Sequence, residues 1–274
     1  MKKNNLWKTE MRNPATMHID QMTTSEMAAC IQKENQNAVI AVGNALPAIE
    51  KACDVIAERL SKGGRLIYIG AGTSGRLGVL DAVECPPTYG VPQSMVVGII
   101  AGGHACMFRA AEQEEDNADF GVKDMKEHSI TAMDVIVGIS AAGNAPYVVG
   151  ALDYARELGC ATISITSNEG SMLTKCADIP IVADTGPEVV TGSTRMKAGT
   201  AQKMILNMLS TIAMIKIGNV YENMMINLRP TNEKLTQRMI RIVEEIIGVD
   251  EEKAKELLEA ADWKIRKAVD TYRE

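Results

Sequence analysis

Apolar runs of strand length alternate with helical stretches along the middle of the chain. Strands are predicted where these runs are rich in Ile and Val, at residues 65–69, 94–100, 133–139, 161–166 and 179–182. Helices are predicted from the turn after the first strand to about residue 82, over most of 105–127, over 146–158, and over 195–217. Strands that are separated by helices are typical of βαβ units, so the pattern predicts an α/β fold with a doubly wound parallel sheet.

The N-terminal part of the chain has a different pattern. Residues 1–23 are polar and are predicted to form an extended arm. A helical region should follow over 24–61, with Thr24 or Ser25 as its N-cap, because short polar side chains accept hydrogen bonds from the first turn. Pro47 predicts a boundary or a kink in this region, since proline lacks the N–H that a helix interior needs.

The composition changes to charged amphipathic helix after Pro230. Three short helices are predicted at 234–247, 250–260 and 262–272, with Gly248 ending the first and Asp250 and Asp262 as N-caps. We therefore predict two parts: a large domain with its N-terminal arm, residues 1–230, and a small C-terminal three-helix appendage, residues 231–274, which resembles ubiquitin-associated domains.

Composition narrows the function classes. With 274 residues, 46% of them hydrophobic, the chain can form one large core and a small appendage. Its net charge of −6 and its scattered Lys and Arg residues argue against nucleic acid as a partner, and no apolar run reaches the length of a membrane span. The six cysteines form no C-x-x-C pair and the three histidines have no metal-ligand spacing, so we expect no metal and no other cofactor. Free thiols without a signal peptide predict a cytoplasmic protein.

A glycine-rich segment joins the first predicted strand to its helix. It reads G-A-G-T-S-G-R from Gly70, which matches the dinucleotide fingerprint G-x-G-x-x-G. That fingerprint expects an acidic residue about twenty positions on, and none is found there. Helix-start N–H groups with neighbouring hydroxyls suit a phosphate monoester, so we predict a phosphate site at Gly72, Thr73, Ser74 and Gly75. The alternative is a tight turn that needs its glycines only for geometry.

A second loop follows the predicted strand 133–139 and contains Ser140, Gly143 and Asn144. Ligands of open α/β sheets bind at the carboxyl ends of the strands, so two loops of this kind could hold one phosphorylated sugar. The alternative is an ordinary connection between a strand and a helix.

The sequence leaves two possible roles for the residues just before the predicted helix 195–217. Glu188 could contact the sugar or only shape its loop, and Ser193 and Thr194 could cap the helix or reach a ligand. Arg195 and Lys197 are interpreted as helix-surface charges. His104 could assist opening of a sugar ring, although a structural or incidental histidine is the simpler interpretation.

Two glutamates stand out among the carboxylates. Glu84 precedes Pro86 and Pro87 at the expected end of a helix, where the prolines could hold its carboxylate rigidly; the alternative is a surface acid. Glu115 lies in the acidic segment 112–116, whose spacing by itself is typical of a solvated helix face.

Longer motifs carry a resemblance to a known family. They read T-E-x-R-N-P from Thr9, the run G-A-G-T-S-G-R-L-G-V-L-D from Gly70, E-C-P-P-T from Glu84, E-x-x-E-D from Glu112, G-P-E-V-V-T-G-S-T-R-M-K-A-G-T-A-Q-K from Gly186, and T-N-E-K-L from Thr231. The chain resembles the sugar isomerase domain family, and within it the N-acetylmuramic acid 6-phosphate etherases. The resemblance implies a flavodoxin-like, three-layer αβα domain that binds a phosphosugar.

One loop departs from that family. Many members read S-G-R-T-P-Y where this chain reads A-G-N-A-P-Y from Ala142 to Tyr147. A hydroxyl and a guanidinium are lost, so any contact that they make elsewhere would fall here on backbone N–H groups.

The resemblance also implies a reaction in the recycling of cell-wall amino sugars. Members cleave the D-lactyl ether of N-acetylmuramic acid 6-phosphate with water to N-acetylglucosamine 6-phosphate and D-lactate. In the open-chain aldehyde a base can remove the proton beside the carbonyl, lactate can leave once an acid protonates it, and water then adds. Two glutamates in different environments can divide these roles. The resemblance implies Glu115 as the base and Glu84 as the acid.

Two other functions stay open. An aldose–ketose isomerase removes the same proton but forms a ketose, and a non-catalytic sensor would only bind the phosphosugar; the presence of both Glu84 and Glu115 favours an enzyme. The resemblance further implies a homodimer, in which arms such as residues 1–23 complete the neighbour's site.

Overall fold

A parallel five-stranded sheet forms the centre of the computed structural model, which describes residues 7–109, 112–230 and 232–273. The strands are β1 (Leu66–Gly70), β2 (Val96–Ile100), β3 (Val135–Ile139), β4 (Ala161–Thr166) and β5 (Ile179–Val182). Their order in the sheet is β2-β1-β3-β4-β5, and every neighbouring pair is parallel. This is the flavodoxin-like, doubly wound order, so the predicted fold class is confirmed.

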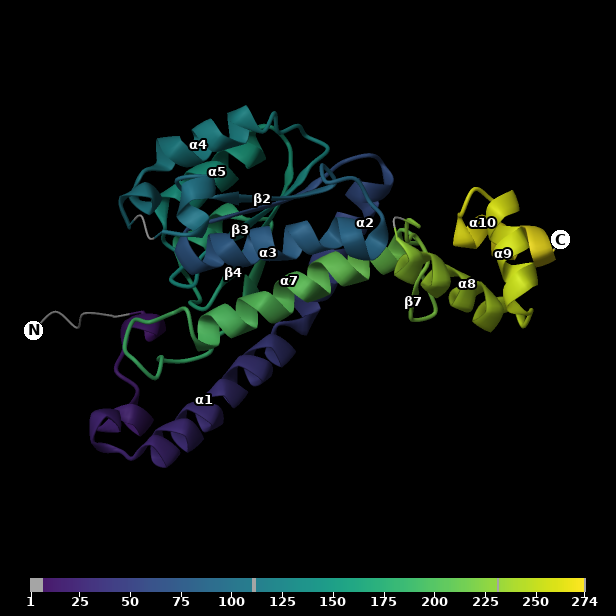
Figure 1. Cartoon of the computed structure of the whole chain (residues 1–274). Helices are drawn as coiled ribbons and strands as arrows, with labels where there is room; N and C mark the ends of the chain where they lie inside the picture. The colour runs from purple at the N-terminus through teal and green to yellow at the C-terminus, as the bar shows by residue number, and fades with distance from the viewer. Residues whose placement is uncertain (1–6, 110–111, 231, 274) are drawn as a thin grey trace, which may run out of the picture.

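Helices cover both faces of the sheet (Figure 1). One layer holds α2 (Leu46–Ser61), α3 (Gly72–Tyr89) and α7 (Lys197–Lys216), and the other holds α4 (Ala118–Glu127), α5 (Pro146–Glu157) and the short α6 (Met172–Cys176). Leu66 and Tyr68 of β1 pack into the first layer, whereas Ile67 and Ile69 pack into the second, because successive strand side chains point to opposite faces. Both faces are therefore buried, which explains why the strands read as continuous apolar runs.

The N-terminal helical region is two helices. The first, α1 (Thr24–Asn44), is capped by Thr23 and Glu26 in a capping box, so the predicted caps Thr24 and Ser25 are wrong by one or two positions. The second, α2, begins at Leu46 with Pro47 in its first turn, as the predicted boundary requires.

Two predicted segments differ from the structure. From residue 7 onward the arm is not extended but forms 3₁₀ turns at Lys8–Glu10, Pro14–Thr16 and Ile19–Gln21, which bury Thr9, Asn13 and Thr16; residues 1–6 lie outside the described residues. The stretch 105–127 is α-helical only in α4, after 3₁₀ turns at His104–Met107 and Glu112–Asp116, and residues 110–111 are outside the described part.

The helix α3 continues past both prolines and ends at Gly90, which has a left-handed φ of 66°. Its last turn contains Pro86 and Pro87, so their missing N–H groups cost the helix only two late hydrogen bonds. Glu84 therefore lies inside the helix and does not close it, contrary to the sequence interpretation.

The C-terminal appendage consists of α8 (Glu233–Ile247), α9 (Glu251–Ala260) and α10 (Ile265–Arg273). Gly248 and Asp250 end and cap these helices as predicted, but Asp262 does not, because α10 starts three residues later and Asp262 has a φ of 53°.

A hairpin that was not predicted precedes the appendage, with strands β6 (Val220–Tyr221) and β7 (Met224–Met225). The following residues Ile226 and Leu228 are buried in the core of the appendage. The apolar core of the appendage therefore starts before residue 231, and the boundary at residue 230 stays a prediction. None of the helices in the described part of the chain has the length and apolar character needed to cross a membrane.

Candidate active site

The strand order reverses between β1 and β3, because the chain leaves β1 toward β2 and returns to β3 on the other side. Loops diverge at such a switch point and leave a crevice at the carboxyl ends of the strands. A cavity of about 340 Å³ lies there, a volume typical of small-molecule sites. It is lined by residues 71–74 after β1, by 139–142 and Ala145 after β3, and by Glu10, Glu115 and Thr194.

The turn after β1 presents backbone donors to this cavity. Gly72 begins α3 with a φ of 52°, and the first helical hydrogen bond runs from the N–H of Gly75 to the carbonyl of Ala71, 3.1 Å. The N–H groups of Gly72, Thr73 and Ser74 precede it, and such first-turn groups have no partner inside a helix. Gly75 itself is buried and does not line the cavity; a Cβ there would lie 2.5 Å from the oxygen of Gly70.

Ser74 connects the turn to α7. Its side chain is almost fully buried, and its hydroxyl donates to Oε1 of Gln202 over 3.0 Å. Within the described residues, Nε2 of Gln202 is buried and has no hydrogen-bond partner. Ser74, which lines the cavity, is thus linked to a buried amide of α7.

The loop after β3 divides into lining and anchoring residues. Ser140 lines the cavity, and its Oγ accepts from the N–H of Gly143 over 3.1 Å. Gly143, with a φ of 77°, packs so tightly that a Cβ would lie 2.3 Å from Oγ of Ser171. Asn144 accepts from the N–H of Met172 over 3.0 Å and donates to the carbonyl of Ala142. Gly143 and Asn144 are therefore outside the lining and fix the loop against the connection after β4.

Arg76 fixes the segment that leads to Glu115. Its guanidinium donates to the carbonyl oxygens of Cys106, Met107 and Arg109 at 2.6, 3.0 and 2.9 Å. The following 3₁₀ turn, Glu112–Asp116, brings Glu115 to the wall of the cavity. The structure thus places Glu115 and the glycine-rich turn in the lining of one cavity.

Glu10 is a lining residue that the sequence interpretation did not select. The neighbouring Thr9 is 1% exposed and accepts from Nδ2 of Asn168 over 3.0 Å, which anchors this segment to the loop after β4. Glu10 and Glu115 are the two carboxylates among the described residues of the cavity. The sequence signal for this residue is the T-E-x-R-N-P motif, in which Glu10 is the second position.

Glu188 and Ser193 lie outside the lining. Glu188 is fully buried, and its two carboxylate oxygens accept from the N–H groups of Lys197 and Ala198, at 3.1 and 2.9 Å. It therefore caps α7 in place of Ser193 or Thr194. Thr194 lines the cavity.

Lys197 is buried, so its interpretation as a surface charge is wrong. Its Nζ lies 2.5 Å from Glu34 of α1 and 2.7 Å from the carbonyl of Pro187. Asn13 also donates to Glu34, over 2.7 Å. Burial acts to raise the pKa of Glu34, but the hydrogen bonds from Lys197 and Asn13 outweigh it and hold that pKa below its usual value.

Arg195 and His104 are exposed. His104 lies against Phe108 with 5.6 Å between ring centroids and is outside the lining of the cavity. In the described part of the chain, no three His, Cys, Asp or Glu residues are grouped as metal ligands would be.

Glu84 does not line the cavity that holds Glu115. It is exposed and borders a small groove of about 170 Å³ between α3 and α7, with Leu80, Asp81 and Lys203. It follows Thr73 by eleven helical residues, a rise of about 16 Å. Within the described residues of one chain, the two predicted catalytic residues therefore line different cavities.

The parallel sheet, its strand order and its hydroxyl-lined crevice agree with the sugar isomerase domain that the comparisons identify. The SIS domain model matches residues 119–212, and the model of the glucokinase regulatory protein N-terminal SIS domain matches residues 48–156. Phosphoheptose isomerase from Neisseria gonorrhoeae is similar in structure, with a TM-score of 0.54 and 18% identity over 70% of this chain and 98% of that chain. A phosphoheptose isomerase from Francisella tularensis gives a TM-score of 0.51 and 17% identity over the same shares, 70% and 98%. A UBA-like domain model matches residues 245–272.

The sequence relatives define the branch. The N-acetylmuramic acid 6-phosphate etherases of Yersinia pestis strain Pestoides F and of Yersinia pseudotuberculosis strain YPIII are each 50% identical to this chain over 261 residues. The match covers 95% of this chain and 88% of each relative. The chain belongs to the N-acetylmuramic acid 6-phosphate etherase family.

Proposed function

We propose that this chain is a carbon–oxygen lyase that cleaves the D-lactyl ether of N-acetylmuramic acid 6-phosphate to N-acetylglucosamine 6-phosphate and D-lactate, by elimination and addition of water. The observation that carries the proposal is that the glycine-rich turn and Glu115 line one cavity at the switch point of the sheet. The identity of the substrate is inferred from membership of the etherase family.

The phosphate is held by N–H groups and hydroxyls. No Lys or Arg is among the described residues that line the cavity, so the first turn of α3, Thr73, Ser74 and Ser140 supply the donors. If the amide of Gln202 is rotated by half a turn, its unpartnered Nε2 donates to Ser74. The hydroxyl proton of Ser74 is then available to a phosphate oxygen.

Glu115 is the proposed base. Once the sugar is open, the proton on C2 is acidified by the aldehyde at C1, and Glu115 removes it. The electron pair forms the C2–C3 double bond as the C3–O bond to lactate breaks, and an acid protonates the departing oxygen. Water then adds to C3, and the proton returns to C2.

The acid is the second residue to assign, and Glu84 of the same chain is outside the lining of this cavity. We assign it to Glu84 of a second copy in a homodimer, because the distance along α3 separates Glu84 from the phosphate turn of its own chain. Apolar side chains close to Glu84 support an interface: Leu80 and Val83 are 48% and 58% exposed. Glu10 is the competing acid, since it already lines the cavity.

The test is incubation with N-acetylmuramic acid 6-phosphate followed by separate assays for D-lactate and for ketose. Release of D-lactate with N-acetylglucosamine 6-phosphate is expected. Ketose without lactate would instead identify an isomerase.

A non-catalytic phosphosugar sensor is the second candidate, favoured by the match of residues 48–156 to the regulatory-protein model. It predicts phosphosugar binding without either product. We further propose that the reaction takes place in the cytoplasm, where six free cysteines stay reduced.

A further inference from the structure

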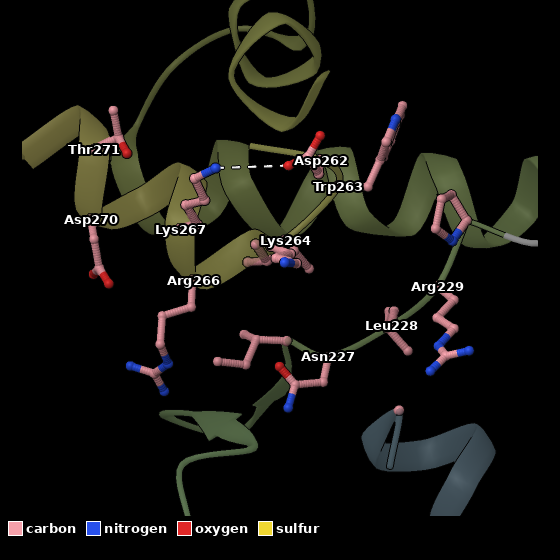
Figure 2. A pocket seen from close by; sticks show the side chains of 14 residues that line it. Asn227, Leu228, Arg229, Asp262, Trp263, Lys264, Arg266, Lys267, Asp270 and Thr271 are labelled. Atoms are coloured by element: carbon pink, nitrogen blue, oxygen red, sulfur yellow. Dashed lines mark ion pairs between the residues drawn. The ribbon is translucent and has the colours of Figure 1, made fainter. Parts of the chain in front are cut away.

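A second and larger cavity lies beyond the far end of α3 (Figure 2). Its volume is about 760 Å³, which suits a small molecule. One wall is the segment 226–230 that leads into the appendage, and the other is the turn and helix at 262–271. Gly90, which ends α3, also lines it, and the 18 residues of α3 span about 27 Å, so this cavity is distinct from the candidate active site.

Positive charge is concentrated in this cavity. Its charged side chains are the cations Arg229, Lys264, Arg266 and Lys267 and the carboxylates Asp262 and Asp270. Four cations against two carboxylates give a formal net charge of +2, opposite in sign to the −6 of the whole chain. An anion is therefore the ligand that this cavity favours electrostatically.

Two of these cations are available to a ligand. Lys267 lies 3.8 Å from Asp262, and Arg266 donates to the carbonyl of Gly218 over 3.0 Å. Within the described residues, the side chains of Arg229 and Lys264 have neither an ion pair nor a hydrogen-bond partner. Figure 2 shows them on different segments that border the cavity, one before α8 and one before α10.

The remaining lining is mostly apolar, with Asn227 and Thr271 as its uncharged polar residues. Ile226, Leu228 and Ile265 are only 2%, 6% and 0% exposed and form the buried base of the cavity, so the apolar surface open to a ligand comes from Pro230 and the partly exposed indole of Trp263. Asp262 and Trp263, which line this wall, have left-handed φ angles of 53° and 57°. This conformation costs energy in residues other than glycine. Such a surface suits an organic body attached to the anion better than a bare, hydrated ion.

We propose that this cavity binds a phosphate monoester of a small metabolite, with Arg229 and Lys264 on the phosphate. A phosphate monoester carries a charge of about −1.5 to −2 at neutral pH, which matches the net charge of the lining. The proposal does not depend on the etherase reaction.

Tryptophan fluorescence gives a local test, because Trp7 and Trp263 are the two tryptophans of the chain. In a full-length Trp7→Phe variant, Trp263 alone reports the cavity. The probes are N-acetylglucosamine 6-phosphate, inorganic phosphate and neutral N-acetylglucosamine. The test variant adds Arg229→Gln and Lys264→Gln; the control adds Lys253→Gln and Lys255→Gln, which remove the same charge from α9 outside the cavity.

The phosphosugar should give a saturable change that the neutral sugar does not give. Affinity should fall by about 100-fold in the Arg229/Lys264 variant, the loss expected for two charge-assisted contacts, and stay unchanged in the control. No response to the phosphosugar, an equal response to the neutral sugar, or an equal loss in the control would overturn the proposal. Inorganic phosphate binding as tightly as the phosphosugar would overturn the assignment of an organic ligand.

Discussion

At the scale of single residues, the two proposed catalytic glutamates differ in when they act. Proton removal from C2 comes first and needs only the base, whereas the acid matters when lactate departs. Glu115→Gln should therefore lose both exchange of the C2 proton and lactate release. Glu84→Gln should keep the exchange while lactate release falls by about two to four orders of magnitude. Deuterium incorporation from heavy water, read by mass spectrometry, measures the first step for each variant.

The outcome for Glu10→Gln separates the two candidate acids. Continued exchange with collapsed lactate release in this variant, and normal release in Glu84→Gln, would move the acid to Glu10. Exchange in Glu115→Gln but not in Glu84→Gln would reverse the assigned roles.

Ser74 tests the phosphate site. Because Ser74 lines the cavity in the first turn of α3, Ser74→Asp should abolish phosphosugar binding by repulsion between two anions. Ser74→Ala removes the hydroxyl without adding charge and should weaken binding about tenfold. Calorimetry measures both, with Thr200→Asp on exposed α7 surface as a control for added charge. Unchanged affinity in folded Ser74→Asp would exclude this turn as the phosphate site.

At the scale of elements, the buried pair Lys197–Glu34 ties α1 to the start of α7. Glu34→Gln leaves Lys197 buried without its counter-ion and should lower the free energy of unfolding by about 3 kcal/mol at neutral pH. The folded pKa of Glu34 is lower than its unfolded pKa, so the stabilisation is present above the unfolded value and is lost as pH falls through the folded one.

Denaturant unfolding over a pH series checks this prediction. The difference between the native chain and Glu34→Gln should be constant above about pH 5 and shrink below about pH 4. The exposed pair Glu58–Lys62 provides a control, since Glu58→Gln should change stability by less than about 0.5 kcal/mol. A constant difference down to acid pH would show that the pair does not carry the effect.

Elements were predictable where local signals decide them. The strands 161–166 and 179–182 match to the residue, because buried parallel strands are short apolar runs between turn residues. The 3₁₀ turns before α1 were not predicted, because long-range contacts such as that of Thr9 with Asn168 stabilise them. The hairpin β6–β7 was not predicted either, because it adjoins the apolar core of the appendage.

At the scale of the whole molecule, the position of Glu84 makes a homodimer testable by complementation. If Glu84 acts in the partner's site, a mixed dimer of Glu84→Gln and Glu115→Gln subunits contains one intact site. Equal co-expression should restore roughly a quarter of the native activity, because half of the dimers are mixed and each has one intact site of two. If both residues acted in one chain, mixing would restore nothing. Sedimentation that shows only monomers would contradict the dimer itself.

The sequence by itself determined the fold class and the glycine-rich turn, because strand burial and helix starts are local properties of the chain, whereas Glu115 was selected only through the resemblance of its motif. Only the tertiary structure decided which of the named residues share a cavity. Gly143 and Asn144 anchor their loop, Glu188 caps α7, Glu10 lines the cavity, and Glu84 borders a different groove. The reason is that spacing along a chain fixes distance within a helix, whereas convergence of loops depends on the order in which strands pair.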